Sequence, residues 1–323
     1  MAQDARGLFY PIYPDGMMPI EIWTGGRGNK IIGCHTEGGI IGISMAKGQS
    51  HGVVSSCTAR LAKFIGIELA AASDLTIVGC IVDCDDVTET GVSLDYQLHP
   101  DDEFIGTGYV VEGVTVTRPA LRGIAAIAPA PTSANEWLGG NINIKATTLF
   151  GDAANVKAVE IQNLEGVEID IFVDGAAATG SQGVVVDSCT GISARARTRR
   201  MASQAFQIFR SGTETSDNIH LVHENLDNTG TGVQLLGSSG AFGEHVTLRT
   251  LGIGYYGVRN PYLAKVAQAD ADCLLLEGEI VGSPESVIVA AVGSGVTRTD
   301  GGAGTCRYVK ETAPTSSTGW VGK

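Results

Sequence analysis

The sequence lacks the patterns that several large classes of protein require. Its seven cysteines form no C-x-x-C pair, and their odd number cannot close a complete disulfide framework, so we expect small, buried, apolar thiols. Asp and Glu outnumber Lys and Arg by 35 to 22, and the resulting net charge of −13 argues against nucleic acid as a partner. No apolar run approaches about 18 residues, so we expect no membrane-spanning segment and no secretory signal. The chain is therefore predicted to be made in the cytoplasm.

Cofactor and metal motifs are missing as well. Thr24-Gly-Gly-Arg-Gly-Asn-Lys30 does not match the phosphate-binding pattern G-x-x-x-x-G-K-[ST], and the Ca²⁺ spacing D-x-[DN]-x-[DN]-G does not occur. His220 and His223 are three apart, whereas a shared metal needs two apart on a strand or four apart on a helix. We therefore expect no cofactor and no metal site.

What the chain does have is glycine and a repeat of short strands. Gly makes up 44 of 323 residues, about twice the usual share, as expected where a chain turns sharply in every coil. Two series of short, alternating apolar segments recur every 22 to 28 residues. The first series begins at Val114, Ile142, Val167, Ile192, Ile219, Val246 and Leu274, and the second at Val159, Val184, Phe206, Val233 and Val258.

This period predicts an all-β solenoid, because each coil holds at least two strands with one face toward a core. Leucine-rich, WD-blade and helix-pair signatures are missing, which leaves a single-stranded parallel β-helix, expected to be right-handed. Coils stacked about 4.8 Å apart would align equivalent residues in rows. One outward row would contain Thr117, Lys145, Asp170 and Arg195, of which the last three alternate favourably in charge.

Three regions are expected. Residues 1–29 do not share the coil pattern and would form either a docking arm or an N-terminal cap. Residues 30–281 would form the β-helix, with less regular early coils. Residues 282–323 change character and would form a short C-terminal β module, with two strands joined at Asp300-Gly-Gly302 and Trp320 as an apolar anchor.

Asp83 and Asp85 are the candidate catalytic residues. They lie two apart on a predicted strand, hence on one face with Cα atoms roughly 6.6–7 Å apart, which is compatible with the paired carboxylates of a glycosidase. The alternative is an ordinary strand-to-loop junction, where Asp bonds to its own backbone.

Side chains suited to glycan binding are expected in two loops and on the outer face. The loop from about Thr88 to Thr107 interrupts the repeat, a second loop spans Ala128 to Leu138, and a basic cluster follows Ile192. The alternative for the loops is that they are merely solvated, and the alternative for the aromatic ring is that it folds onto the coil. The arginines could either capture an acidic glycan or form ion pairs with Asp170 and Glu224. The candidates are Tyr96, His99, Asp101, Asp102, Trp137, Arg195 and Arg197.

The C-terminal segment carries a family resemblance. Tyr308-Val-Lys-Glu311 and Thr318-Gly-Trp-Val321, preceded by Gly282-Ser-Pro-Glu285, resemble the C-terminal module of bacteriophage tail spikes and related virion proteins, and the repeat resembles their pectate-lyase-like β-helix. The resemblance implies a homotrimer on a virion, made in the host cytoplasm, with other virion proteins and host cell-surface polysaccharide as partners. Tyr308, Trp320 and Val321 would then pack at the trimer axis; the alternative is a module that covers the last coil of a monomer.

The resemblance leaves two functions open. A trimeric tail spike, fibre or capsid decoration would present its β-helix for glycan adhesion or virion attachment. A tail-spike polysaccharide depolymerase, either hydrolase or lyase, is the alternative. The N-T-D, G-H-G and R-I-K motifs of pectin hydrolases do not accompany Asp85-Asp86, which favours the non-catalytic function.

Overall fold

The computed structural model describes most of the repeat region and parts of both ends. The described residues are 2–3, 9–10, 19–23, 25–96, 106–129, 138–176, 178–209, 217–227, 233–236, 246–251, 265–266, 274–280, 282–286, 290–298, 300–301, 306–313 and 316–323. All regular structure in these ranges is β-strand, as expected. Within the same ranges, no helix has the length and apolar character needed to cross a membrane.

One long sheet contains ten parallel strands, one from each successive coil. Their order along the sheet follows the chain, because each strand pairs with its equivalents in the coils before and after. The strands are β3 (Ile20–Ile22), β7 (Ile41–Ala46), β11 (Ile65–Ala70), β14 (Thr90–Asp95), β16 (Arg122–Ile127), β18 (Lys157–Gln162), β20 (Gln182–Asp187), β22 (Phe206–Phe209), β24 (Val233–Leu236) and β26 (Lys265–Val266).

The second long sheet contains sixteen strands and forms the other side of the coils. Its strands are β5 (Lys30–Ile32), β6 (His35–Glu37), β9 (Val53–Ser55), β10 (Thr58–Arg60), β12 (Thr76–Val78), β13 (Ile81–Asp83), β15 (Val110–Thr117), β17 (Leu138–Leu149), β19 (Leu164–Asp174), β21 (Thr190–Arg199), β23 (Asp217–Asp227), β25 (Val246–Leu251), β27 (Leu274–Ile280), β28 (Gly295–Arg298), β29 (Arg307–Lys310) and β30 (Trp320–Gly322). Two small sheets pair β1 (Ala2–Gln3) with β2 (Phe9–Tyr10), and β4 (Gly26–Arg27) with β8 (Gln49–Ser50).

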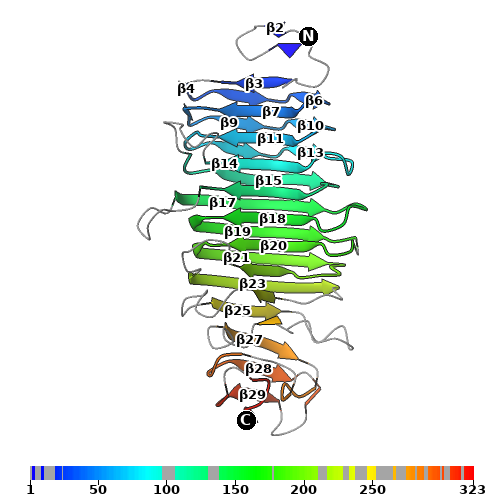
Figure 1. Cartoon of the computed structure of the whole chain (residues 1–323), viewed down its shortest axis with the longest axis vertical. Coiled ribbons are helices and arrows are strands. Elements are labelled where there is room, and N and C mark those ends of the chain that lie inside the picture. The colour runs from blue at the N-terminus through cyan, green and yellow to red at the C-terminus, as the bar shows by residue number, and fades with distance from the viewer. Residues whose placement is uncertain are drawn as a thin grey trace.

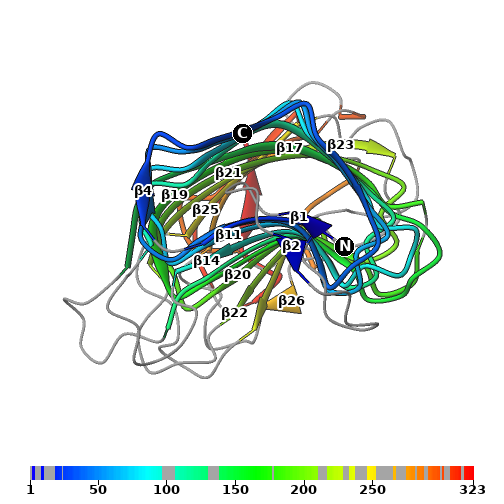
Figure 2. The ribbon, with the colours of Figure 1, turned by 90° about the horizontal axis from the view of Figure 1, so that it is seen from above.

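Stacking of the coils produces an elongated solenoid. Figure 1 shows the strands succeeding one another along the long axis, from the N-terminal end to the C-terminal end. Seen along that axis in Figure 2, strands β17, β19 and β21 of the sixteen-stranded sheet lie on one side, and strands β11, β14 and β20 lie on the other. The predicted parallel β-helix is therefore confirmed, and its core lies between the two sheets.

The predicted rows are largely confirmed. Ile142 pairs with Val167, and Ile192, Ile219, Val246 and Leu274 follow in register. In the ten-stranded sheet, Val159, Val184, Phe206 and Val233 align as expected. The row also extends toward the N-terminus, beyond the prediction, through Ile20, Ile43, Ile67, Val92 and Ile124. The early coils are therefore as regular in this sheet as the later ones.

Three details of the predicted register are wrong. Val114 pairs with Ala146 instead of Ile142, and the pairing offset changes by one residue at Gly113, whose φ of 62° is in the left-handed region. The strand that continues the second series is Lys265–Val266 instead of a segment at Val258. Parallel pairing begins with β3 at Ile20, so the solenoid starts before the expected boundary at residue 30.

A turn inside the early coils explains why sixteen strands occupy one sheet. In each of three early coils, one residue with positive φ divides the strand into two short pieces. These residues are Gly33, Ser56 and Gly79. From β15 onward the two pieces merge, because β15 pairs with both β12 and β13. The later coils therefore present long, continuous outer surfaces that the early coils do not have.

The core is aliphatic and closely packed. Inward side chains of both sheets, such as Ile67, Val92 and Ile171, are fully buried. Each Å² of apolar surface that is buried stabilises the folded state by about 25 cal/mol, so this continuous core is the main stabilising feature of the fold. Four cysteines, Cys57, Cys80, Cys84 and Cys189, are buried thiols as expected. Cys306 is exposed and Cys34 is only partly buried, which corrects the expectation that all thiols are buried.

The C-terminal module extends the sixteen-stranded sheet. Strand β28 pairs in parallel with β27, and β29 and β30 add antiparallel strands beyond it. The two strands predicted around Asp300 are confirmed as β28 and β29, and β30 is a third that the pattern did not reveal. The module therefore covers the last coil edge to edge within one chain.

Candidate functional site

Asp83 and Asp85 lie in a surface ion-pair cluster. Strand β13 ends at Asp83, and Asp85 lies in the following turn with a φ of 51°, so the expectation that both occupy one strand is wrong. Arg118 contacts both carboxylates, because its guanidinium pairs with Asp85 and lies 3.6 Å from Oδ1 of Asp83. Arg60 Nε donates a hydrogen bond to Asp83 Oδ2 over 3.3 Å.

The protonation of Asp83 follows from these contacts. Burial by itself would raise the pKa of the Asp83 carboxyl, but hydrogen bonds from Thr117 and Arg60, with the charge of Arg118, lower it below the ordinary value. A carboxyl with a lowered pKa is ionised at neutral pH and cannot donate a proton as a general acid. The arrangement fits a structural junction between coils better than a glycosidase pair.

Tyr96 is not at the surface. Its side chain is fully buried in the core, where its ring meets the Tyr109 ring edge to face with centroids 5.2 Å apart. Burial raises the pKa of the Tyr96 hydroxyl, and its oxygen has no hydrogen-bond partner among the described residues. The predicted role of Tyr96 in glycan binding is therefore wrong, because an aromatic residue can pack in the core as well as bind a sugar.

Four candidates lie outside the described residues: His99, Asp101, Asp102 and Trp137. Their predicted roles in glycan binding stay predictions.

Arg195 and Arg197 lie on the outer face of β21, as expected from the alternation. Arg195 pairs with Glu224 at 3.5 Å, and Arg197 lies 3.8 Å from Oδ1 of Asp170. The internal ion pairing considered for this cluster is therefore present. Each arginine side chain is about half exposed and makes one loose ion pair with the described residues, although its guanidinium carries five N–H donors.

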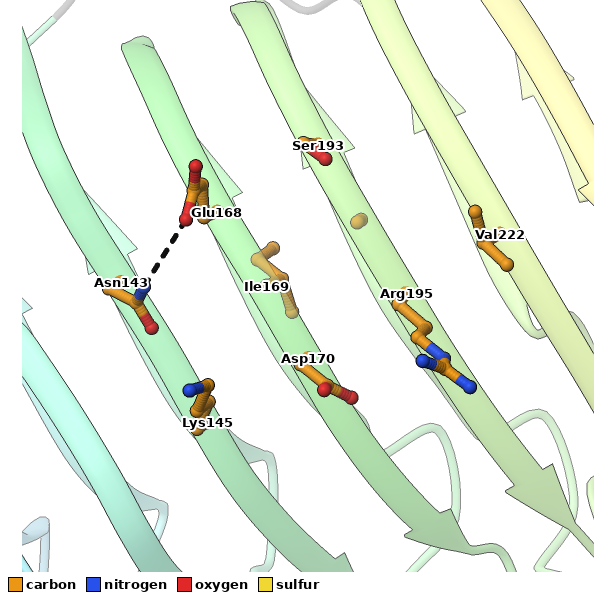
Figure 3. A pocket seen from close by; sticks show the side chains of 9 residues that line it. Asn143, Lys145, Glu168, Ile169, Asp170, Ser193, Arg195 and Val222 are labelled. Atoms are coloured by element: carbon orange, nitrogen blue, oxygen red, sulfur yellow. Dashed lines mark hydrogen bonds between the residues drawn. The ribbon is translucent and has the colours of Figure 1, made fainter.

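Beside Arg195 the outer face contains a shallow depression of about 250 Å³. Figure 3 shows its side chains on β17, β19, β21 and β23, at successive positions across four coils. Its polar side chains are Asn143, Lys145, Glu168, Asp170, Ser193 and Arg195. They come together because Asn143, Glu168 and Ser193 occupy one outward row, and Lys145, Asp170 and Arg195 occupy the next.

A second depression of about 340 Å³ adjoins the first. Lys145 and Asp170 line both, and the second continues toward Thr115 and Thr147 on one side and Arg197 on the other. We refer to the two depressions together as the outer groove. Since its lining comes from β15, β17, β19, β21 and β23, the groove exists only where the merged strands form a continuous outer surface.

The polar groups of the outer groove are only partly satisfied by one another. Asn143 Nδ2 donates to Glu168 Oε2 over 3.3 Å, the dashed line of Figure 3. Lys145 is exposed and makes no ion pair or hydrogen bond with any described residue. Oδ1 of Asp170 is shielded from solvent and has no hydrogen-bond partner among the described residues. The groove thus combines donors, acceptors and one unpaired cation.

The three residues expected at a trimer axis have different environments. Val321 is exposed, Tyr308 is partly buried, and Trp320 is buried within its own chain. The Lys310 ammonium lies 5.6 Å from the centre of the Trp320 ring and donates to the carbonyl oxygens of Ser316, at 2.6 Å, and Thr318. Trp320 is thus buried inside its own protomer, as its predicted role as an apolar anchor requires.

The outer groove was missed as a site because the sequence pattern identifies its members only as outward residues. Lys145 and Asp170 share a row with Arg195, and that shared position was the available signal. No group of three or more His, Cys, Asp or Glu side chains is placed to hold a metal ion in the described ranges. No protein-family model and no curated protein matches the chain.

Proposed function

We propose that this chain is a structural appendage protein of a bacteriophage particle, a trimeric tail spike, fibre or capsid decoration, that binds host-surface glycans along its outer groove. The observation that supports this proposal best is the groove, a polar depression on a rigid sheet. The sheet backbone fixes the spacing of these side chains, so a ligand that spans several coils binds at a lower ordering cost than it would on mobile loops.

The C-terminal module supports the virion part of the proposal. The Tyr308-Val-Lys-Glu311 and Thr318-Gly-Trp-Val321 segments, which carry the resemblance to tail-spike modules, contribute neighbouring antiparallel strands. Their strands continue the sheet of the solenoid, and Val321 remains exposed at this end. An exposed apolar side chain beside an antiparallel edge is suited to contact between copies of the chain.

Electron microscopy of purified particles, labelled with an antibody against this chain, tests the virion assignment. We expect label at one site, on the tail or on the head shell. Particles that carry no label and contain none of this chain by mass spectrometry would refute it.

Light scattering on the full chain tests the trimer. We expect a mass of three protomers, and dissociation when the chain is truncated after Val281. A monomeric full chain would refute the trimer. A truncated chain that stays trimeric would move the interface to the sides of the β-helix.

A second function, polysaccharide cleavage, has one observation in its favour. Glu168 and Asp170 lie two apart on β19, face outward and line the outer groove, so they satisfy the spacing proposed for Asp83 and Asp85. If the chain is a depolymerase, Asp170→Asn should abolish release of reducing ends from host polysaccharide, whereas Asp83→Asn should leave it unchanged. Wild-type protein that releases none supports adhesion instead.

A further inference from the structure

The outer groove carries as many cations as carboxylates, three of each, although the chain as a whole is acidic. Lys145 on β17 and Arg195 and Arg197 on β21 all project from the same outer face. The net charge of −13 does not exclude an anionic ligand here, because charges farther away than a Debye length of about 8 Å are largely screened at physiological salt. The local arrangement of charges decides what the groove attracts.

Lys145 has the central position in this arrangement. Its side chain is exposed, lines both depressions and has no acidic partner among the described residues. In its row Lys145 lies between Glu112 and Asp170, and the Asp170 carboxylate lies within 3.8 Å of Arg197. An exposed ammonium with three free donors, set between two hollows, is suited to a carboxylate of a ligand.

The remaining groups match the rest of a sugar. Glu168 and Asp170 can accept hydrogen bonds from sugar hydroxyls, and Ser193 and Asn143 carry groups that pair with hydroxyls and ring oxygens. Val222, the next residue in the row after Arg195, offers an apolar surface to a C–H face of a ring. A purely anionic ligand such as phosphate would meet Glu168 and Asp170 as repulsive neighbours, whereas a hydroxyl-rich anion would bond to them.

We propose that the outer groove binds an acidic polysaccharide, with a uronic-acid carboxylate held by Lys145 and a further carboxylate within reach of Arg195 or Arg197. This inference rests on the proposed glycan-binding function and names its ligand class. Lys145 and Arg195 are two coils apart, about 10 Å, and Arg195 and Arg197 are about 7 Å apart along one strand. The ligand must therefore extend over more than one sugar residue.

The test is an array of bacterial capsular and secreted polysaccharides, each printed in its native form and after carboxyl reduction, which converts uronic acids to neutral sugars. The full-length wild-type chain should bind polysaccharides that contain uronic acid and lose binding to their reduced forms. For the best native ligand, Lys145→Met should weaken binding about tenfold, the effect of losing one charge-assisted hydrogen bond. Lys145→Arg should restore most of it.

The matched control is Lys30→Met, which removes an exposed lysine from β5 on the same sheet, far along the solenoid from the groove. It should bind like wild type. Equal binding to native and reduced polysaccharides, binding to neutral polysaccharides alone, no binding to any, or a Lys145→Met variant that binds like wild type would each overturn the inference. Antibody labelling of particles is judged separately, so adhesion to a neutral glycan would leave the proposed function in place.

Discussion

Glu68 permits a quantitative prediction from a single buried carboxyl. Its side chain lies on β11, is only 4% exposed, and accepts a hydrogen bond from Ser44 Oγ over 2.7 Å. Burial raises the pKa of Glu68 to about 7, and nearby Asp95 and Glu21 add to the effect, although the Ser44 hydrogen bond opposes it. The perturbation we choose is Glu68→Gln, which keeps the shape and the hydrogen-bond acceptor but cannot ionise.

The sign follows from proton binding in the two states. Between pH 4.5 and about 7 the folded protein holds the Glu68 proton, whereas the unfolded chain has released it. The free energy of unfolding therefore falls as pH rises through this window, by about 1.4 kcal/mol per pH unit and by about 3 kcal/mol in total. Glu68→Gln removes this loss. The difference in unfolding free energy, variant minus wild type, should therefore be about 3 kcal/mol larger at pH 8 than at pH 4.5.

The assay is equilibrium urea unfolding followed by far-ultraviolet circular dichroism at pH 4.5, 6 and 8. Groups that do not interact with Glu68 titrate alike in both proteins, so the difference between the two stability curves reports on Glu68 and the carboxyls coupled to it. Glu112→Gln is the control, because it removes an exposed carboxylate on β15 and should leave a constant difference. A Glu68→Gln difference that does not change with pH would refute the reasoning.

Three further predictions concern the core, the C-terminal module and the coil turns. His223 is 1% exposed and burial lowers its pKa to about 4, so stability should fall by about 3 kcal/mol as pH drops from 6.5 to 4, and a His223→Leu variant should lose this dependence in thermal melts. Lys310→Met should cost about 2–3 kcal/mol, since two carbonyl oxygens lose a charged donor; unchanged urea unfolding monitored by far-ultraviolet circular dichroism would contradict this. Gly66→Ala should destabilise the fold by several kcal/mol, because the added Cβ would collide with the core and lie 2.7 Å from the carbonyl oxygen of Gly91 in the next coil. Gly79 lies in open space with a φ of 59°, so Gly79→Ala should cost only about 1–2 kcal/mol, measured in thermal melts of both variants.

The sequence alone determined the fold class, and the reason is local. Alternation of apolar and polar residues decides which side chains face inward along a strand, and a constant interval between strands decides that coils stack. Both properties can be read without tertiary contacts. For this reason the rows through Ile142 and Val159, and the outward order of Lys145, Asp170 and Arg195, were predictable.

Tertiary structure alone decided where the regular pattern shifts and which polar residues meet. Val114 pairs four positions away from the predicted Ile142, and the bulge at Gly113 moves the register by one residue without leaving a signal in the composition. Tyr96 and Trp320 are amphipathic, so a sequence cannot tell whether such rings pack in the core or face a ligand or partner. Asp83 met Arg118 through the pairing of neighbouring coils. The outer groove formed for the same reason: side chains about 25 residues apart become neighbours only when the coils stack.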